Sequence, residues 1–81
     1  MNLETLPLRH KARISGFDLS LLAAHEARRL QELGFDEGVL VERLHHGPMG
    51  KDPIACRVGR RTIALRRRQA AAIFVELEDR S

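Results

Sequence analysis

The chain has 81 residues, with 14 lysines and arginines against 11 aspartates and glutamates, so its formal net charge at pH 7 is +3. A chain of this length supports one small core, because a domain of roughly 60 residues buries only about 60% of the surface that its unfolded chain exposes. We therefore expect a single domain over residues 1–81, with residues 1–8 as a lead-in and residues 79–81 as a tail. A second core and a closed active site are excluded on size.

The sequence carries no sign of export or of a membrane span. Its single cysteine excludes an intrachain disulfide and gives no reason to expect an oxidising compartment. The first ten residues contain Glu4 and Pro7 and lack the apolar stretch of a signal peptide. The longest apolar run, Ala70–Val75, is much shorter than the roughly 20 residues of a membrane-spanning helix. We expect a cytoplasmic protein that does not insert into the membrane.

The first two predicted elements are a strand and a helix. Apolar and polar side chains alternate over residues 11–16, which predicts a half-buried strand. The helix follows over about Leu21–Leu33, and Asp18 or Ser20 could cap its start.

The junction from Arg28 to Gly38 ends this helix and begins the next strand. Gly34 follows the helix where a left-handed residue is needed, and glycine enters that region without a Cβ penalty. Leu30 and Phe35 then occupy the positions of the hydrophobic pair in a Schellman cap. A second turn at Asp36–Gly38 leads into the strand, so Gly34 and Gly38 are assigned structural roles.

The rest of the chain alternates between strands and turns. The elements predicted are a strand at residues 39–44, a loop at Gly47–Pro53, a hairpin at residues 54–65, a short helix at residues 66–73 and a strand at residues 74–78. The loop holds two glycines and two prolines, and Pro53 is assigned a structural role. The hairpin turns at Gly59-Arg60.

Together these elements predict a mainly β protein. We expect a small five-stranded barrel with one α-helix between the first two strands and a short helical turn before the fifth. Such a barrel would remove most exposed sheet edges.

A basic cluster is the main candidate for a binding site. Six arginines and no acid lie between residues 57 and 68. The candidate partner-binding residues are Arg60, Arg61, Arg66, Arg67 and Arg68. An acidic protein partner, a solvated rim and nucleic acid are the three interpretations. Nucleic acid is disfavoured, because the chain has no tryptophan or tyrosine and its three phenylalanines are expected in the core. Charge reversal at Arg60, Arg61 and Arg67 is expected to weaken binding without changing stability.

Metal binding and catalysis have weaker support. His45 and His46 are adjacent imidazoles, but neighbouring residues of a strand point to opposite faces, and only Asp52 or Cys56 could supply a third ligand. We expect solvated histidines there and treat Cys56 as a buried apolar residue. No histidine has a catalytic partner at a recognisable spacing, and the phosphate-binding P-loop pattern is absent from the sequence. The chain is therefore predicted not to be an enzyme.

Several segments together carry a family resemblance. They are Ala12-Arg13-Ile14, Arg29-Leu30-x-Glu32-Leu33-Gly34-Phe35-x-x-Gly38, Gly47-Pro48-Met49-Gly50-x-Asp52-Pro53-Ile54, Ile63-Ala64-Leu65-Arg66 and Ala70-Ala71-Ala72-Ile73-Phe74-Val75. In this order the chain resembles the FeoA family, small SH3-like barrels of bacterial ferrous iron uptake. It departs from the family pattern at His10, often glycine, and at Gln69, often glutamate.

The resemblance implies a role as well as an SH3-like fold. It implies a non-enzymatic cytoplasmic accessory that binds the GTP-binding domain of the membrane ferrous iron permease FeoB, and that could be peripheral at the inner membrane through this partner. No cofactor would be required, although weak binding of Fe(II) or another divalent transition metal is compatible with it. The same domain type forms the C-terminal module of metal-dependent repressors, so a transition-metal-sensing module is the alternative.

Overall fold

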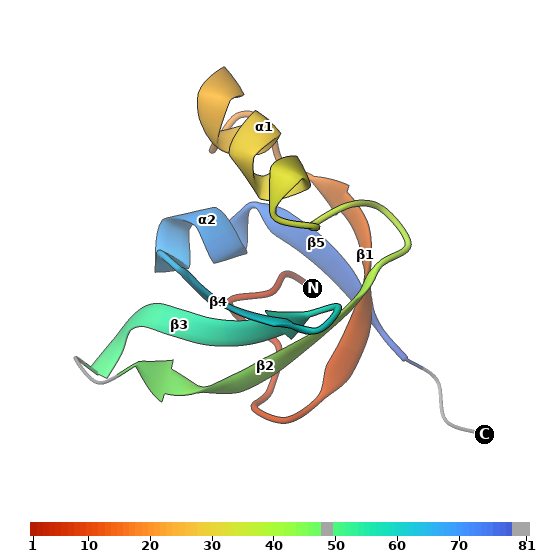
Figure 1. Ribbon diagram of the computed structural model, residues 1–81, viewed down its shortest axis with the longest axis vertical. Helices are drawn as coiled ribbons and strands as arrows, with labels where there is room; N and C mark the ends of the chain where they lie inside the picture. The colour runs from red at the N-terminus through yellow and green to blue at the C-terminus, as the bar shows by residue number, and fades with distance from the viewer. Residues whose placement is uncertain (48–49, 79–81) are drawn as a thin grey trace.

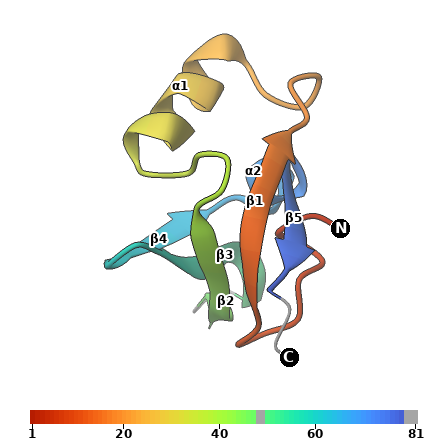
Figure 2. The same cartoon turned by 90° about the vertical axis from the view of Figure 1, so that its right-hand side faces the viewer.

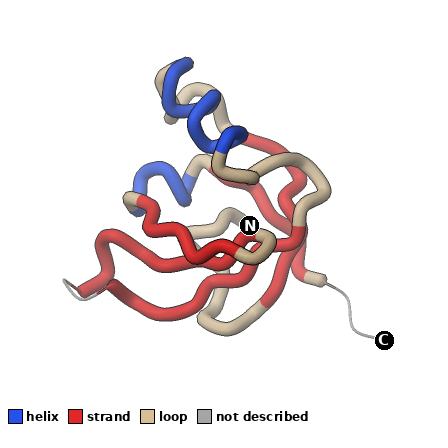
Figure 3. The backbone as a smooth tube through the Cα atoms, in the orientation of Figure 1, coloured by secondary structure: helices blue, strands red, loops and turns tan. Residues whose placement is uncertain are grey.

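The computed structural model describes residues 1–47 and 50–78 of the chain. The elements are β1 (Lys11–Phe17), α1 (Ala24–Glu32), β2 (Leu40–Gly47), β3 (Gly50–Val58), β4 (Arg61–Leu65), α2 (Arg67–Ala71) and β5 (Ile73–Leu77). The five strands form one antiparallel sheet in the order β4-β3-β2-β1-β5. The sheet is strongly bent, and both helices lie toward the same end of the molecule (Figures 1 and 3).

The period-two pattern of the strands places their apolar residues in the core. In β1, Ala12 and Ile14 are buried, whereas Lys11, Arg13 and Ser15, which alternate with them, are exposed. In β3, Ile54, Cys56 and Val58 are buried in the same way. The first strand and the β3–β4 hairpin predicted from this alternation are therefore confirmed.

The helix α1 ends in the cap that the sequence predicts. Gly34 has a φ of +107°, and its N–H donates to the Gln31 carbonyl at 3.0 Å. The Phe35 N–H donates to the Leu30 carbonyl at 2.9 Å, which completes the Schellman pattern. Leu30 and Phe35 are both buried, so the cap fixes the C-terminal end of α1 to the core.

The predicted start of this helix is wrong by about one turn. The first helical residue is Ala24, and the N–H of Ala23 donates to the Glu26 carboxylate at 3.0 Å. Asp18 instead accepts hydrogen bonds from the N–H and hydroxyl of Ser20, at 3.1 and 2.6 Å. A local turn therefore uses the side chains that were expected to cap the helix.

The loop predicted at Gly47–Pro53 is mostly strand. β2 continues to Gly47, β3 begins at Gly50, and these two glycines pair across the ladder. Pro53 consequently lies within β3. Two irregularities in the register between β2 and β3 accommodate the longer hairpin. The segment is mostly strand because pairing along the ladder outweighs the local preference of glycine and proline for turns. Residues 48 and 49 lie outside the described residues.

The end of the chain also differs in detail from the prediction. The short helix covers Arg67–Ala71, within the predicted residues 66–73, and β5 begins one residue earlier than expected, at Ile73. Ala70 is fully buried, so α2 packs onto the core although it is little more than one turn long.

The sheet is not closed, so the expectation of a barrel without edges is only partly correct. β4 and β5 are the end strands of the sheet, and α2 connects them in place of direct strand pairing. The N-terminal residues cover the outer edge of β5: Leu3 donates its N–H to Ile73, and Met1 accepts the N–H of Val75, both at 2.9 Å. Figure 2 shows β5 beside β1 with the N-terminus next to it.

The lead-in at residues 1–8 is therefore part of the fold. From the sequence, it is predicted to contact the core through Leu3, Leu6 and Leu8. Leu3 and Leu6 are completely buried, whereas Leu8 is 40% exposed, so the prediction is wrong for Leu8. No helix among residues 1–47 and 50–78 is long and apolar enough to cross a membrane.

Candidate functional site

The hairpin between β3 and β4 carries two of the candidate arginines at its tip. Arg60 lies in the two-residue turn, Arg61 begins β4, and both are exposed. Within the part of the chain that the structure describes, neither forms an ion pair. We call Arg60 and Arg61 the tip arginines. Arg66, immediately before α2, is exposed as well.

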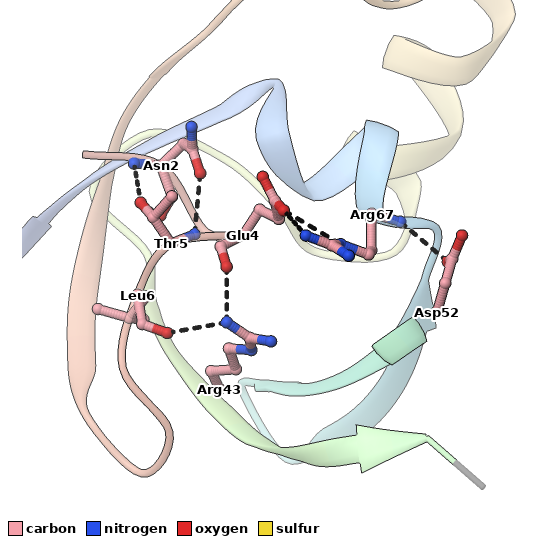
Figure 4. A network of polar contacts seen from close by, with 7 residues as sticks. All are labelled: Asn2, Glu4, Thr5, Leu6, Arg43, Asp52 and Arg67. Carbon is pink, nitrogen blue, oxygen red and sulfur yellow. Dashed lines mark hydrogen bonds and ion pairs between the residues drawn. The ribbon is translucent and has the colours of Figure 1, made fainter. Parts of the chain in front are cut away.

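Arg67 has a different environment, because it joins three segments (Figure 4). Its guanidinium forms an ion pair with Glu4 of the lead-in, with Nε donating to Oε2 at 3.0 Å. Its backbone N–H donates to Oδ1 of Asp52 in β3 at 3.1 Å. Arg67 therefore holds the lead-in and β3 against the start of α2.

Arg68 joins the two helices. Its Nη2 lies 2.6 Å from Oε2 of Glu26 in α1, and its Nη1 donates to the Leu21 carbonyl at 3.0 Å. The hydrogen bond from Arg68, together with that from the Ala23 backbone, lowers the pKa of Glu26 to about 2. The same contact raises the pKa of Arg68.

The basic cluster that is continuous in sequence is thus divided in space. Arg67 and Arg68 attach segments of the chain to one another, while the tip arginines and Arg66 face solvent. The expectation that Arg67 could be reversed without loss of stability is inconsistent with its contacts. Its acid partner, Glu4, is distant in sequence, so the charge pattern of residues 57–68 contained no signal of the pairing.

Sequence reasoning also missed the buried arginine of β2. Arg43 is only 9% exposed, and its Nη1 donates to the backbone carbonyls of Glu4 at 2.6 Å and Leu6 at 3.2 Å (Figure 4). Its own carbonyl accepts the N–H of Arg9. Arg43 therefore holds the lead-in against β2. In the sequence, burial of Arg43 was indicated only by the strand alternation, which places Arg43 on the same face as Val41.

A groove lies between α1 and β4. Its volume is about 480 Å³, and α1 lies above β4 in both views (Figures 1 and 2). Three kinds of side chain line it: apolar residues of α1 and β4, exposed polar residues of both, and Gln69 of α2. The lining residues are His25, Glu26, Arg29, Leu30, Leu33, Thr62, Ile63, Ala64, Leu65 and Gln69. A second hollow of about 320 Å³ involves Leu33, the residue that follows α1, and extends to the tip arginines.

The described residues do not support a metal site. No group of three histidine, cysteine, aspartate or glutamate side chains among them could hold an ion. Burial raises the pKa of the Cys56 thiol to about 12, so this residue is a protonated apolar group rather than a thiolate ligand. His45 and His46 lie in β2, where the backbone of His46 pairs with Ile54, and their side chains are outside the description.

A small, strongly bent antiparallel sheet with a short helix overhanging one edge places the chain among SH3-like β domains. The FeoA domain model matches residues 1–77, and the chain therefore belongs to the FeoA family. The resemblance noted in the sequence is confirmed. No match was found among curated proteins.

Solved structures of this family have the same fold. Iron(II) transport protein A of Clostridium thermocellum is 35% identical with a TM-score of 0.83; the match covers 95% of this chain but 45% of that one, so this chain spans less than half of that protein. The FeoA protein of Chlorobium tepidum is 27% identical with a TM-score of 0.83, covering 95% of this chain and 70% of that one. Stenotrophomonas maltophilia FeoA, solved with zinc, is 37% identical with a TM-score of 0.78, covering 94% and 89%.

Proposed function

We propose that this protein is a non-enzymatic cytoplasmic accessory of ferrous iron uptake that binds the GTP-binding part of a FeoB-type permease. Membership of the FeoA family over residues 1–77 is the observation that carries this proposal. The Stenotrophomonas relative has been described as an SH3 domain protein and proposed as an activating factor of bacterial ferrous iron transport.

The surface of the chain is compatible with this role. The tip arginines are exposed and free of ion pairs within the described residues, so they can meet an acidic surface without first breaking an internal contact. Long-range attraction between such charges raises the association rate and weakens as salt is added. Binding should therefore be strongest at low ionic strength.

The experiment is a calorimetric and NMR titration of the whole chain with the purified GTP-binding domain of the permease, in the presence of GDP or of a non-hydrolysable GTP analogue. We expect saturable binding that weakens with salt, with chemical-shift changes at the hairpin tip. Reversing both tip arginines to glutamate should weaken it. The matched control is Arg28→Glu, an exposed arginine of α1 that is absent from the groove lining. Failure of the wild-type chain to bind in either nucleotide state would refute the proposal.

Metal sensing is a second candidate because the Stenotrophomonas relative was solved with zinc. The candidate ligands remain His45 and His46. An NMR titration with Zn²⁺ or, under anaerobic conditions, Fe²⁺ should then perturb both imidazoles, and the double substitution by alanine should abolish the response. Equal metal affinity in the double variant would exclude these histidines.

A further inference from the structure

We propose that the groove between α1 and β4 receives an extended acidic segment of the partner, which adds to the sheet as a strand beside β4. The chemical nature of the occupant follows from the groove, and its assignment to the permease rests on the proposed function. Addition of a strand to an exposed sheet edge is a general mode of peptide recognition, in which the main chain supplies affinity and side-chain pockets supply specificity.

The backbone of β4 has one open side. The strand pairs with β3 alone, and none of its residues exchanges a backbone hydrogen bond with another element among the described residues. The two-residue turn makes Val58 and Arg61 a hydrogen-bonded pair, and such pairs alternate along an antiparallel ladder. The N–H and C=O groups of Thr62 and Ala64 therefore point away from β3. Both residues line the groove.

This edge is short and carries Arg61, but it lacks the other features that usually protect an edge strand. Such strands are commonly interrupted by a bulge, a proline or a lysine, or are covered by another segment. The register between β3 and β4 runs without a shift from Val58–Arg61 to Ile54–Leu65, and β4 contains neither proline nor lysine. The opposite edge of the sheet, on β5, is covered by the N-terminal residues. An open, regular edge is thus a specific property of β4.

The side chains of the groove indicate what the added strand would carry. Leu33, which follows α1, and Ile63 of β4 are only partly buried and line the groove, so apolar side chains of an added strand could pack on them. An extended chain places every second side chain on the same face. The occupant should therefore have apolar residues at alternate positions.

The charge of the groove and of the adjoining hollow favours an occupant that also carries acidic residues. Glu26, the acid of the lining, is already neutralised by Arg68. Arg29 lines the groove and has no ion pair within the described part of the chain, and the tip arginines lie at the adjoining hollow, where Glu32 is the opposing charge. Cations thus remain in excess along the path that an added strand would follow.

The first test uses the whole chain and a synthetic peptide of eight residues in which valine and glutamate alternate. The control peptide has lysine in place of glutamate. With the acidic peptide at about ten times its Kd, exchange of the Thr62 and Ala64 amides should slow about tenfold, because exchange then proceeds from the unbound fraction. The amides of Arg61, Ile63 and Leu65, which already face β3, are internal controls and should change little.

Two pairs of variants separate the backbone from the charge contribution. Ala64→Pro removes an outward N–H without touching the β3 ladder, as proline is tolerated on the open side of an edge strand. It should weaken peptide binding by about three- to tenfold, the worth of one hydrogen bond, while Ala64→Val should not. Arg29→Glu should weaken binding as well, with Arg28→Glu as its control. The arginine pair keeps the test valid if Ala64→Pro does not fold.

Each outcome has one meaning. Absence of slowed exchange at Thr62 and Ala64 with the acidic peptide, or equal slowing with the lysine peptide, would overturn the groove proposal. Slowed exchange that depends on the concentration of the free protein would identify a second copy as the occupant and overturn it too. If the permease domain binds without slowing these two amides, the groove is refuted and the proposed function stands. If the acidic peptide slows these amides and the permease domain does not bind, the proposed function is refuted and the groove proposal stands.

Discussion

The two edges of the sheet differ in what the chain does with them. At β5 the chain covers its own edge with residues 1–3, and Arg43 and the Glu4–Arg67 ion pair hold this lead-in in place. At β4 no segment of the described chain pairs with the edge, and α1 stands above it. The covered edge ends the sheet, whereas the open edge leaves a groove.

The comparison also explains why arginines of similar exposure differ in role. The side chain of Arg67 is 46% exposed and that of Arg68 is 56% exposed, yet both bind acids from other segments. The tip arginines have no such partner within the described residues. Exposure alone does not distinguish an arginine that stabilises the fold from one available to a partner. What distinguishes them is whether an acidic side chain from another segment lies beside the arginine in the folded chain.

The largest expected effect is at the covered edge. Arg43→Ala should lower the free energy of unfolding by about 3 kcal/mol, because the partly buried carbonyl of Glu4 and the buried carbonyl of Leu6 lose their donor. Urea denaturation of the whole chain would measure it. The control is Arg57→Ala on the exposed face of β3, which should change stability by less than about 0.5 kcal/mol. Equal stability of the two variants would show that Arg43 does not hold the lead-in.

The next largest loss of stability is expected at Gly34, in the cap that fixes the C-terminal end of α1 to the core. Gly34→Val should cost about 1–3 kcal/mol, because valine is strained at a φ of +107°. The Cβ itself adds no clash, because it would meet Val58 at 3.8 Å, an ordinary contact. Gly16→Ala is the control, since its Cβ would also be in ordinary contact, with Phe74 at 3.9 Å, and its φ is not positive. Unchanged denaturation of Gly34→Val would exclude the cap as a source of stability.

A smaller, local loss of stability is expected at low pH from protonation of Glu26, whose ion pair with Arg68 attaches α1 to α2. The pKa of Glu26 in the folded state is about 2, below its ordinary value of 4.5. Because the pKa is lower in the folded state, the ionised Glu26 carboxylate stabilises the fold at pH values above its unfolded-state pKa. This stabilisation is fully present above about pH 4.5 and is lost as the pH falls toward 2. Relative to the intrinsic exchange rate, which itself falls with pH, the protection of the α1 amides should decrease over this range. The Glu26→Gln variant should show no such pH dependence, and an NMR-measured pKa near 4.5 would contradict the ion pair.

The smallest effect on stability is expected at the tip. Replacing Arg60 and Arg61 together by glutamate should change the free energy of unfolding by less than about 0.5 kcal/mol while weakening the permease interaction. Arg67→Glu should by contrast cost about 1 kcal/mol, because it replaces the attraction to Glu4 with repulsion. Thermal denaturation would compare the two. A larger loss at the tip than at Arg67 would reverse the assignment of their roles.

Much of the fold follows from local patterns. The alternation at Ala12 and Ile14, the turn at Gly59-Arg60 and the cap at Gly34 depend on neighbours within a few residues, and all three are present in the structure. Predictions failed where distant segments compete with a local preference. The glycines and prolines of residues 47–53 favour a loop, but pairing between β2 and β3 extends through Gly47 and Gly50.

The candidate site was less predictable for the same reason. The arginines are visible in the sequence, but their division into two groups depends on Glu4 and Glu26, which lie far away along the chain. The groove requires α1 and β4 to lie close together, and no residue spacing encodes that proximity.

The sequence by itself determined the mainly β class, the order of the elements, the helix cap and the family, because these depend on composition, periodicity and short motifs. The folded arrangement decided which arginines form ion pairs, which edge of the sheet is covered and where the groove lies. Each of these depends on contacts between segments distant in sequence: the lead-in with β5 and Arg43, and α1 with α2. Such contacts form when the core brings the segments together, and the local pattern of residues does not specify them.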